Sequence, residues 1–170
     1  MYESIILLPF SAEGARVMGK ARVLSILCVH DNPIFLDRIC RYLEREGNIS
    51  VDISISAEDA LHLMMYVHFD VIITDYTPGL ANNNVFLKAV RDKGNAVPFI
   101  YFAKTRNPDI DAEASRYSPV SFVEWGDTSP THGFEELYKS ILMAAAEPGK
   151  GARSVITIPK DMSPMGGKKE

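Results

Sequence analysis

Two aspartates, Asp31 and Asp75, each follow an apolar run that is typical of a buried strand. In an open parallel sheet, ligands bind and reactions take place at the carboxyl ends of the strands. Two carboxylates that meet there could share a hard cation such as Mg²⁺, or one of them could accept a phosphoryl group. The side chains beside them decide whether such a site would work.

The elements that would position these carboxylates alternate between strand-like and helix-like patterns. Strands are predicted over residues 23–29, 51–55, 71–74, 97–102 and 120–124. Helices are predicted through residues 33–46, 57–67, 85–90, 107–117 and 134–145. Strict alternation predicts an α/β fold with a doubly wound, five-stranded parallel sheet in the flavodoxin-like strand order 2-1-3-4-5. The adjacent Met64 and Met65 fall within a predicted helix and are expected to be core residues.

The chain divides into an N-terminal arm over 1–21, one domain over 22–147 and a flexible tail over 148–170. The arm contains the apolar run Ile5–Leu8, which follows Glu3 rather than a basic region and so makes a poor signal peptide. In the tail, Val155–Ile158 is a short apolar piece that could dock as a strand on a sheet edge. The roles of the arm and the tail are left open.

Composition narrows the classes of function. The 170 residues carry a net charge of −4, which gives no bulk attraction for nucleic acid. No apolar run approaches the roughly 20 residues that a membrane-spanning helix needs. Cys28 and Cys40 are expected to pack as small hydrophobic side chains rather than form a disulfide or a metal site, which fits the reducing cytoplasm.

The ordered set of segments resembles the receiver domain of two-component response regulators over about residues 23–146. The resemblance is carried by the turn Val29-His30-Asp31-Asn32-Pro33, the strand end Ile73-Thr74-Asp75-Tyr76, the turn Pro78-Gly79 and the strand at 97–102. It implies a signalling module rather than an enzyme, which takes a phosphoryl group from a histidine kinase onto an aspartate. An acidic pair and that aspartate would hold Mg²⁺, which offsets the charge on the phosphoryl oxygens.

The resemblance also assigns roles to single positions. Asp75 matches the phosphoacceptor, and Asp31 matches the second member of the acidic pair. The backbone carbonyl of Thr77 would be a further metal ligand, although Pro78 comes one residue early in this turn. Phe122 matches the aromatic residue that changes rotamer when receivers are activated.

Three positions depart from the family pattern. His30 stands where the first acidic residue is expected, Ala103 where a Thr or Ser hydroxyl is expected, and Trp125 where a lysine is expected. Each departure removes a contact with Mg²⁺ or with phosphoryl oxygens. Lys104 and Thr105 lie close by in sequence but are expected to be solvated loop residues. Weak or absent Mg²⁺ binding and impaired phosphorylation are therefore expected.

His30 and Trp125 have several interpretations. His30 could be a cation that bridges Asp31 and Asp75 in place of Mg²⁺, a ligand of a transition metal, or a solvent-facing side chain. Trp125 could fill the place of the phosphoryl group, anchor a partner protein or pack in the core.

We expect a receiver domain that gives its output through protein contacts, since no DNA-binding domain follows it. Its partner would be a histidine kinase or another signalling protein, with a homodimer as a further option. One alternative is a pseudo-receiver that is never phosphorylated and acts only as a protein-binding module. Another is a flavodoxin-like domain for a small ligand, which is disfavoured because no Gly-, Ser- or Thr-rich phosphate loop follows the first strand.

Overall fold

The computed structural model describes residues 22–75, 83–127 and 130–146. Thr77, the Pro78–Gly79 turn, the N-terminal arm and the C-terminal tail lie outside these residues, so the division into arm, domain and tail stays a prediction.

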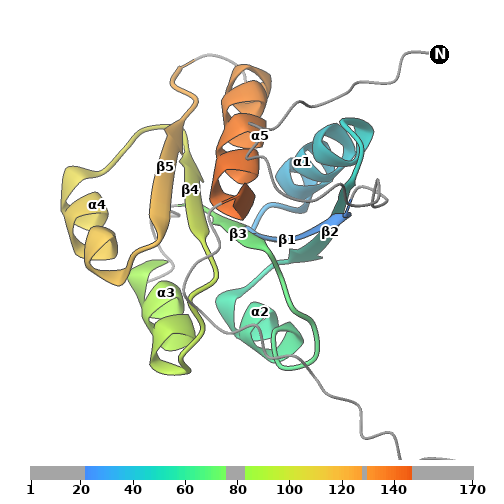
Figure 1. Ribbon diagram of the computed structural model, residues 1–170. Coiled ribbons are helices and arrows are strands. Elements are labelled where there is room, and N and C mark those ends of the chain that lie inside the picture. Colours follow the sequence, from blue (N-terminus) through green and yellow to red (C-terminus); the bar gives the residue numbers. More distant parts are fainter. Residues whose placement is uncertain (1–21, 76–82, 128–129, 147–170) are drawn as a thin grey trace, which may run out of the picture.

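The described residues form a parallel sheet of five strands in the order β2-β1-β3-β4-β5, which confirms the predicted flavodoxin-like topology (Figure 1). The strands are β1 (Leu24–Val29), β2 (Ile49–Ser54), β3 (Val71–Thr74), β4 (Phe99–Ala103) and β5 (Val120–Glu124).

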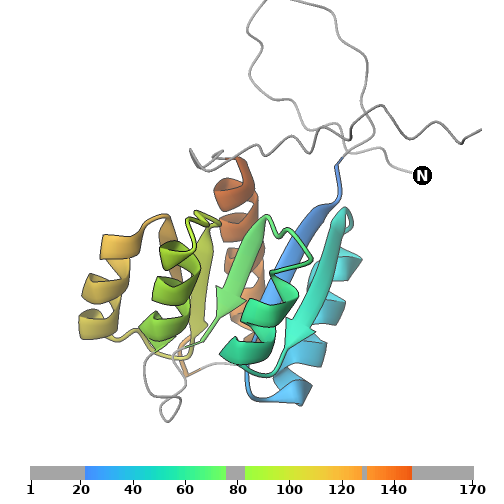
Figure 2. The same ribbon diagram turned by 90° about the horizontal axis from the view of Figure 1, so that it is seen from below.

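Helices cover both faces of this sheet, as strict alternation requires. They are α1 (Pro33–Arg45), α2 (Ala57–Leu63), α3 (Asn83–Asp92), α4 (Pro108–Ala114) and α5 (Pro130–Ala146), with a 3₁₀ turn at Ser115–Tyr117. Figure 2 shows α1 and α5 on one face and α2, α3 and α4 on the other. None of the helices in the described part of the chain is long and apolar enough to cross a membrane.

The helices begin where side chains can cap their free N–H groups. The Asn32 side chain accepts bonds from the amides of Ile34 and Phe35, and Pro33 occupies the first helical position of α1. Ser56 caps α2 by accepting a bond from the amide of Asp59. These caps set the points at which the chain leaves the carboxyl ends of β1 and β2.

The core has one apolar layer on each side of the sheet. The layer under α1 and α5 includes Ile26, Cys28 and Ile73, whereas the layer under α2, α3 and α4 includes Leu27 and Ile72. This alternation follows from the two-residue period of a strand. Cys28 packs as a small hydrophobic side chain, as predicted, and both cysteines are free thiols. Burial raises the pKa of the Cys28 thiol.

One sequence-based expectation about the second helix is wrong. Helix α2 ends at Leu63 rather than continuing to Val67. Met65 therefore lies beyond the helix and is 66% exposed, so it is not a core residue, whereas Met64 is partly buried. The apolar pattern overestimated the length of α2, because it counted both methionines as core residues, whereas only Met64 packs against the core.

Candidate functional site

The pairing of β1 with β3 brings two of the predicted site residues together. Val29 is the register partner of Thr74 in this parallel pair. His30 and Asp75 are the next residues of the two chains, so both emerge side by side at the carboxyl end of the sheet. The sequence predicted this position, and strand order is what makes the two residues neighbours.

His30 lies between the two aspartates. Its Nε2 atom is 3.1 Å from Asp75 Oδ2, and its Nδ1 atom is 3.1 Å from Asp31 Oδ1. The side chains of His30 and Asp75 are 14% and 24% exposed, whereas that of Asp31 is 51% exposed. The contact with Asp75 is therefore the better shielded of the two, and the stronger.

The hydrogen bonds of the imidazole identify its donor atom. The backbone amide of Asn32 donates to Nδ1 of His30 across 2.9 Å, so this nitrogen acts as an acceptor. Asp31 contacts the same nitrogen but could be bonded only if Nδ1 carried a proton. The cap at Asn32 holds this amide in place, whereas the Asp31 side chain is half-exposed to water. His30 thus donates through Nε2 to Asp75.

The arrangement does not fit the Mg²⁺ ion that the resemblance implies. The carboxylates of Asp31 and Asp75 contact opposite nitrogens of one ring instead of facing a common point. Imidazole is also a poor ligand for Mg²⁺, which prefers oxygen. Within the described residues, no group of three or more His, Cys, Asp or Glu side chains is placed to hold a metal ion. Thr77, the further candidate ligand, lies outside them.

Aromatic side chains hold the imidazole from the side of α1 and α5. The ring of Phe35 lies 4.5 Å from that of His30 and 6.0 Å from that of Phe102, between centroids. Trp125 approaches Phe35 at 6.5 Å. The hollow beneath His30 and Asp75 measures about 10 Å³, which leaves room for about one water molecule. The ring is therefore packed in place rather than free to swing.

The two other altered positions lie at the ends of β4 and β5. Ala103 is 2% exposed, and its carbonyl accepts a bond of 3.0 Å from the amide of Trp125. The Trp125 ring packs against the core layer of α1 and α5, so core packing is the interpretation with direct structural support. Lys104 forms a 3.0 Å ion pair with Asp127 and is 57% exposed, in line with the expected solvated loop.

Comparisons with known proteins complete this description. No protein-family model matches the sequence, and no curated protein matches it. Solved structures do match its fold. The response regulator domain of Thermotoga maritima CheB superposes with a TM-score of 0.65 at 21% identity, covering 74% of this chain and 98% of that one.

Two further structures agree. The chemotaxis protein CheY4 of Vibrio cholerae gives a TM-score of 0.62 at 21% identity, over 72% of this chain and 98% of that one. The receiver domain of the Francisella response regulator 1452 gives a TM-score of 0.61 at 17% identity, over 72% of this chain and 97% of that one. The chain has the receiver fold.

Within this receiver fold, the predicted switch residue Phe122 is enclosed on both sides. Its ring stacks on Tyr101 at 5.6 Å, and the Arg106 guanidinium lies 4.9 Å from its centroid. Tyr101 is fully buried and donates a 2.8 Å hydrogen bond to Asn84 on α3. The Asn84 amide donates in turn to Glu113 on α4 across 3.0 Å. The aromatic pair is thereby connected to the helices of one face.

Sequence reasoning missed three residues that shape the receiver pocket and its surroundings. Phe35 looked like one more apolar position of α1, and only its contact with His30 reveals its role. Asn84 ends a run of three asparagines, a residue type that is common in turns, yet its side chain is buried and bonded. Gly133 leaves no room for a Cβ, which would lie 2.5 Å from Trp125 Cβ. A glycine in the first turn of an otherwise regular helix was the available signal for this close approach.

Proposed function

We propose that this chain is a receiver module that signals through protein contacts and whose Asp75 is phosphorylated slowly or not at all. The observation that carries the proposal is the 3.1 Å contact between His30 Nε2 and Asp75 Oδ2. The histidine takes up the carboxylate oxygen that would otherwise face a divalent ion or attack a phosphoryl group. Receiver domains among the solved structures of the same fold support the signalling class.

Electrostatics supports slow chemistry at Asp75. Phosphoryl transfer depends on cations and donors that neutralise charge on the phosphoryl oxygens. The imidazole of His30 cannot offer the two positive charges of Mg²⁺, Ala103 offers no hydroxyl, and Trp125 carries no charge. Each lost contact of this kind costs about 2–4 kcal/mol in the transition state. Two such losses correspond to a slowing by a factor on the order of a thousand or more.

The partner in this proposal is a histidine kinase or another signalling protein, with self-association as a second option. The surface that supports it carries Arg106 over Phe122, with the Arg106 guanidinium also bonded to Asp111 on α4 at 2.7 Å. Arginine is one of the residue types enriched at the hot spots of protein interfaces. A partner protein could bind a module of this kind without phosphorylation of Asp75.

The test is incubation of the full chain with acetyl phosphate and Mg²⁺, followed by measurement of the intact mass, with Asp75→Ala as the control. We expect no stable added phosphoryl group, or one that forms far more slowly than in a receiver with all site residues. Rapid addition of one phosphoryl group that the Asp75→Ala variant lacks would contradict impaired phosphorylation. Complete absence of addition would identify the limiting case of this proposal, a pseudo-receiver that only binds proteins.

A second measurement uses Trp125, the single tryptophan of the chain, as a reporter beside the site. Beryllofluoride with Mg²⁺ mimics a phosphorylated aspartate, and we expect it to leave the tryptophan emission unchanged. A saturable change in emission that requires Asp75 would count against the proposal.

A further inference from the structure

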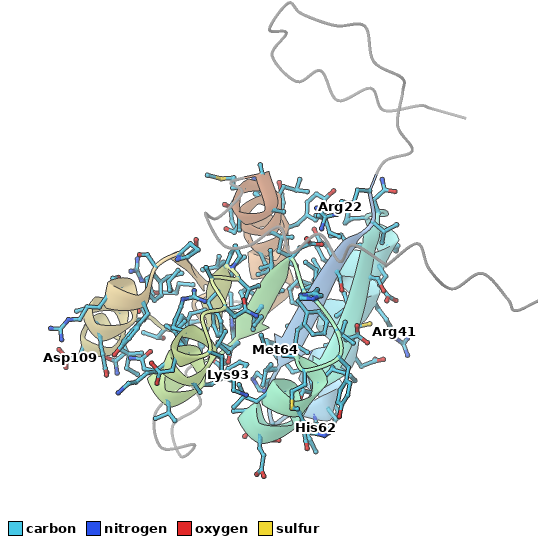
Figure 3. All side chains as sticks on the ribbon, turned by 60° about the horizontal axis from the view of Figure 1, so that its bottom comes forward. Arg22, Arg41, His62, Met64, Lys93 and Asp109 are labelled. Carbon is cyan, nitrogen blue, oxygen red and sulfur yellow. The ribbon has the colours of Figure 1, made fainter. Side chains whose placement is uncertain are left out.

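A groove of about 200 Å³ lies between α2 and α3, far from the site at His30. Figure 3 labels Met64 and Lys93, which follow the carboxyl ends of these two helices. Both helices run antiparallel to the strands, so the groove lies at the amino ends of the strands, opposite Asp75. The residues that line it are mostly apolar: Leu61, Met64, Met65, Val90, Lys93 and Asn95.

The rim of the groove exposes large apolar side chains. Met65 is 66% exposed, and the adjacent Tyr66 is 73% exposed. Neighbouring exposed side chains of this size mark surfaces that bind another apolar segment. Methionine suits such a surface because its unbranched, polarisable side chain adapts to the shape of what it contacts.

We propose that this groove binds the apolar run Ile5–Leu8 of the same chain. The first described residue, Arg22, forms an ion pair with Asp70. The carboxylate of Asp70 also accepts a 2.9 Å bond from the amide of Ser25, which ties the start of β1 to the loop that leads from Met65 into β3. The arm therefore leaves the domain beside the loop that carries one wall of the groove.

The length of the arm allows this placement. Residues 9–21 separate the apolar run from Arg22. Thirteen extended residues span up to about 45 Å, which is comparable with the width of a domain of this size. The run can thus reach the groove without any change in the described residues.

Charge favours the arm over the other apolar segment outside the described residues. Among the described residues that line the groove, Lys93 alone carries a charge. Glu3 precedes the run Ile5–Leu8, and the first basic residue of the arm is Arg16. An acidic side chain next to an apolar run complements a lysine on the rim of an apolar groove.

The C-terminal tail fits less well on two counts. Its apolar piece, Val155–Ile158, lies between Arg153 and Lys160, which would bring like charge to Lys93. It also follows α5, which covers the face of the sheet opposite to α2 and α3 (Figure 2). The arm is therefore the occupant that we propose, and its binding does not depend on phosphorylation of Asp75.

The test follows the methyl resonances of Met64 and Met65 by NMR in the full chain with ¹³C-labelled methionine methyls. Single Met64→Leu and Met65→Leu variants assign them. The variant Ile6→Asp with Leu7→Asp should release the arm, and both resonances are expected to shift. Met143, which is 72% exposed on α5, should not respond.

The matched control places the same charges in the tail, as Ile156→Asp with Ile158→Asp, and should leave Met64 and Met65 unchanged. A shift with the tail variant alone would overturn the proposal in favour of the tail. No shift with either variant would mean that the groove is unoccupied by the chain, which also overturns it. Resonances that move on dilution but not with the arm variant would identify a second copy as the occupant.

Discussion

His30 donates through Nε2 to Asp75 across 3.1 Å, between residues that directly follow the neighbouring strands β1 and β3. A carboxylate in place of this imidazole would restore the acidic pair with Asp31 and remove the donor from Asp75. We expect His30→Asp to bind Mg²⁺, detected as a saturable change in Trp125 fluorescence. Phosphorylation by acetyl phosphate should rise by a factor on the order of ten or more.

The matched control is His68→Asp, which makes the same substitution at an exposed position away from the site. It should change neither Mg²⁺ binding nor phosphorylation. Equal effects of both variants would show that net charge, and not the position of His30, controls the site.

Gly133 marks a close contact between α5 and the strand ends. A Cβ at this position would lie 2.5 Å from Trp125 Cβ and 2.8 Å from Phe102 Cε2. We expect Gly133→Ala to lower the free energy of unfolding by about 1–3 kcal/mol, because the clash outweighs the gain in helix propensity. Urea unfolding measures the change. The control Ser140→Ala, at a half-buried position of the same helix, should be close to neutral, and an equal loss there would refute the contact argument.

Arg91 on α3 supports three backbone carbonyls. It donates to Tyr117 at 2.8 Å, to Asn95 at 2.9 Å and to Pro119 at 3.2 Å, and its guanidinium lies 5.2 Å from the Phe99 centroid. Desolvation by burial lowers the pKa of this guanidinium. Arg91→Met keeps the apolar stem but leaves the carbonyls without these donors. We expect a loss of about 2–5 kcal/mol in thermal or urea unfolding.

The exposed Lys88 of the same helix provides the comparison for Arg91. Lys88→Met should change stability by less than about 0.5 kcal/mol, since no buried acceptor among the described residues depends on this exposed side chain. Similar losses for the two variants would mean that the carbonyl contacts of Arg91 contribute little.

Tyr101 should make stability depend on pH in the alkaline range. Burial, with a smaller contribution from the charge of Glu113, raises the pKa of this phenol above its ordinary value of 10.0. The unfolded chain then loses the proton first, so the contribution is full below about pH 10 and declines as pH rises above it. The slope for one proton is about 1.4 kcal/mol per pH unit.

Tyr101→Phe tests this dependence. The variant should lose about 1 kcal/mol at neutral pH because the bond to Asn84 disappears. Above about pH 10 its stability should fall less steeply than that of the unsubstituted chain in urea unfolding. Buried Cys28 titrates in both proteins, so the difference between them isolates Tyr101. Parallel curves would contradict the assignment.

Much of the fold could be predicted from local signals. The apolar runs of β3 and β5 gave their exact ends, Val71–Thr74 and Val120–Glu124. Asn32 and Ser56 marked helix starts, because a capping side chain acts within three residues of its own position. The end of α2 could not be predicted in this way, since the apolar pattern continues past Leu63 through Met64 and Met65, although Met65 is exposed.

The sequence by itself determined the receiver-like order of elements, and it placed Asp31, His30 and Asp75 at the carboxyl end of the parallel strands. It did so because strand and helix periods, and the rule that parallel strands end together, are properties of the chain alone. Only the tertiary structure decided that His30 lies between the two carboxylates and donates to Asp75. That orientation depends on the Asn32 amide, and on Phe35, which is packed by Phe102 from a distant strand. No local pattern records such packing.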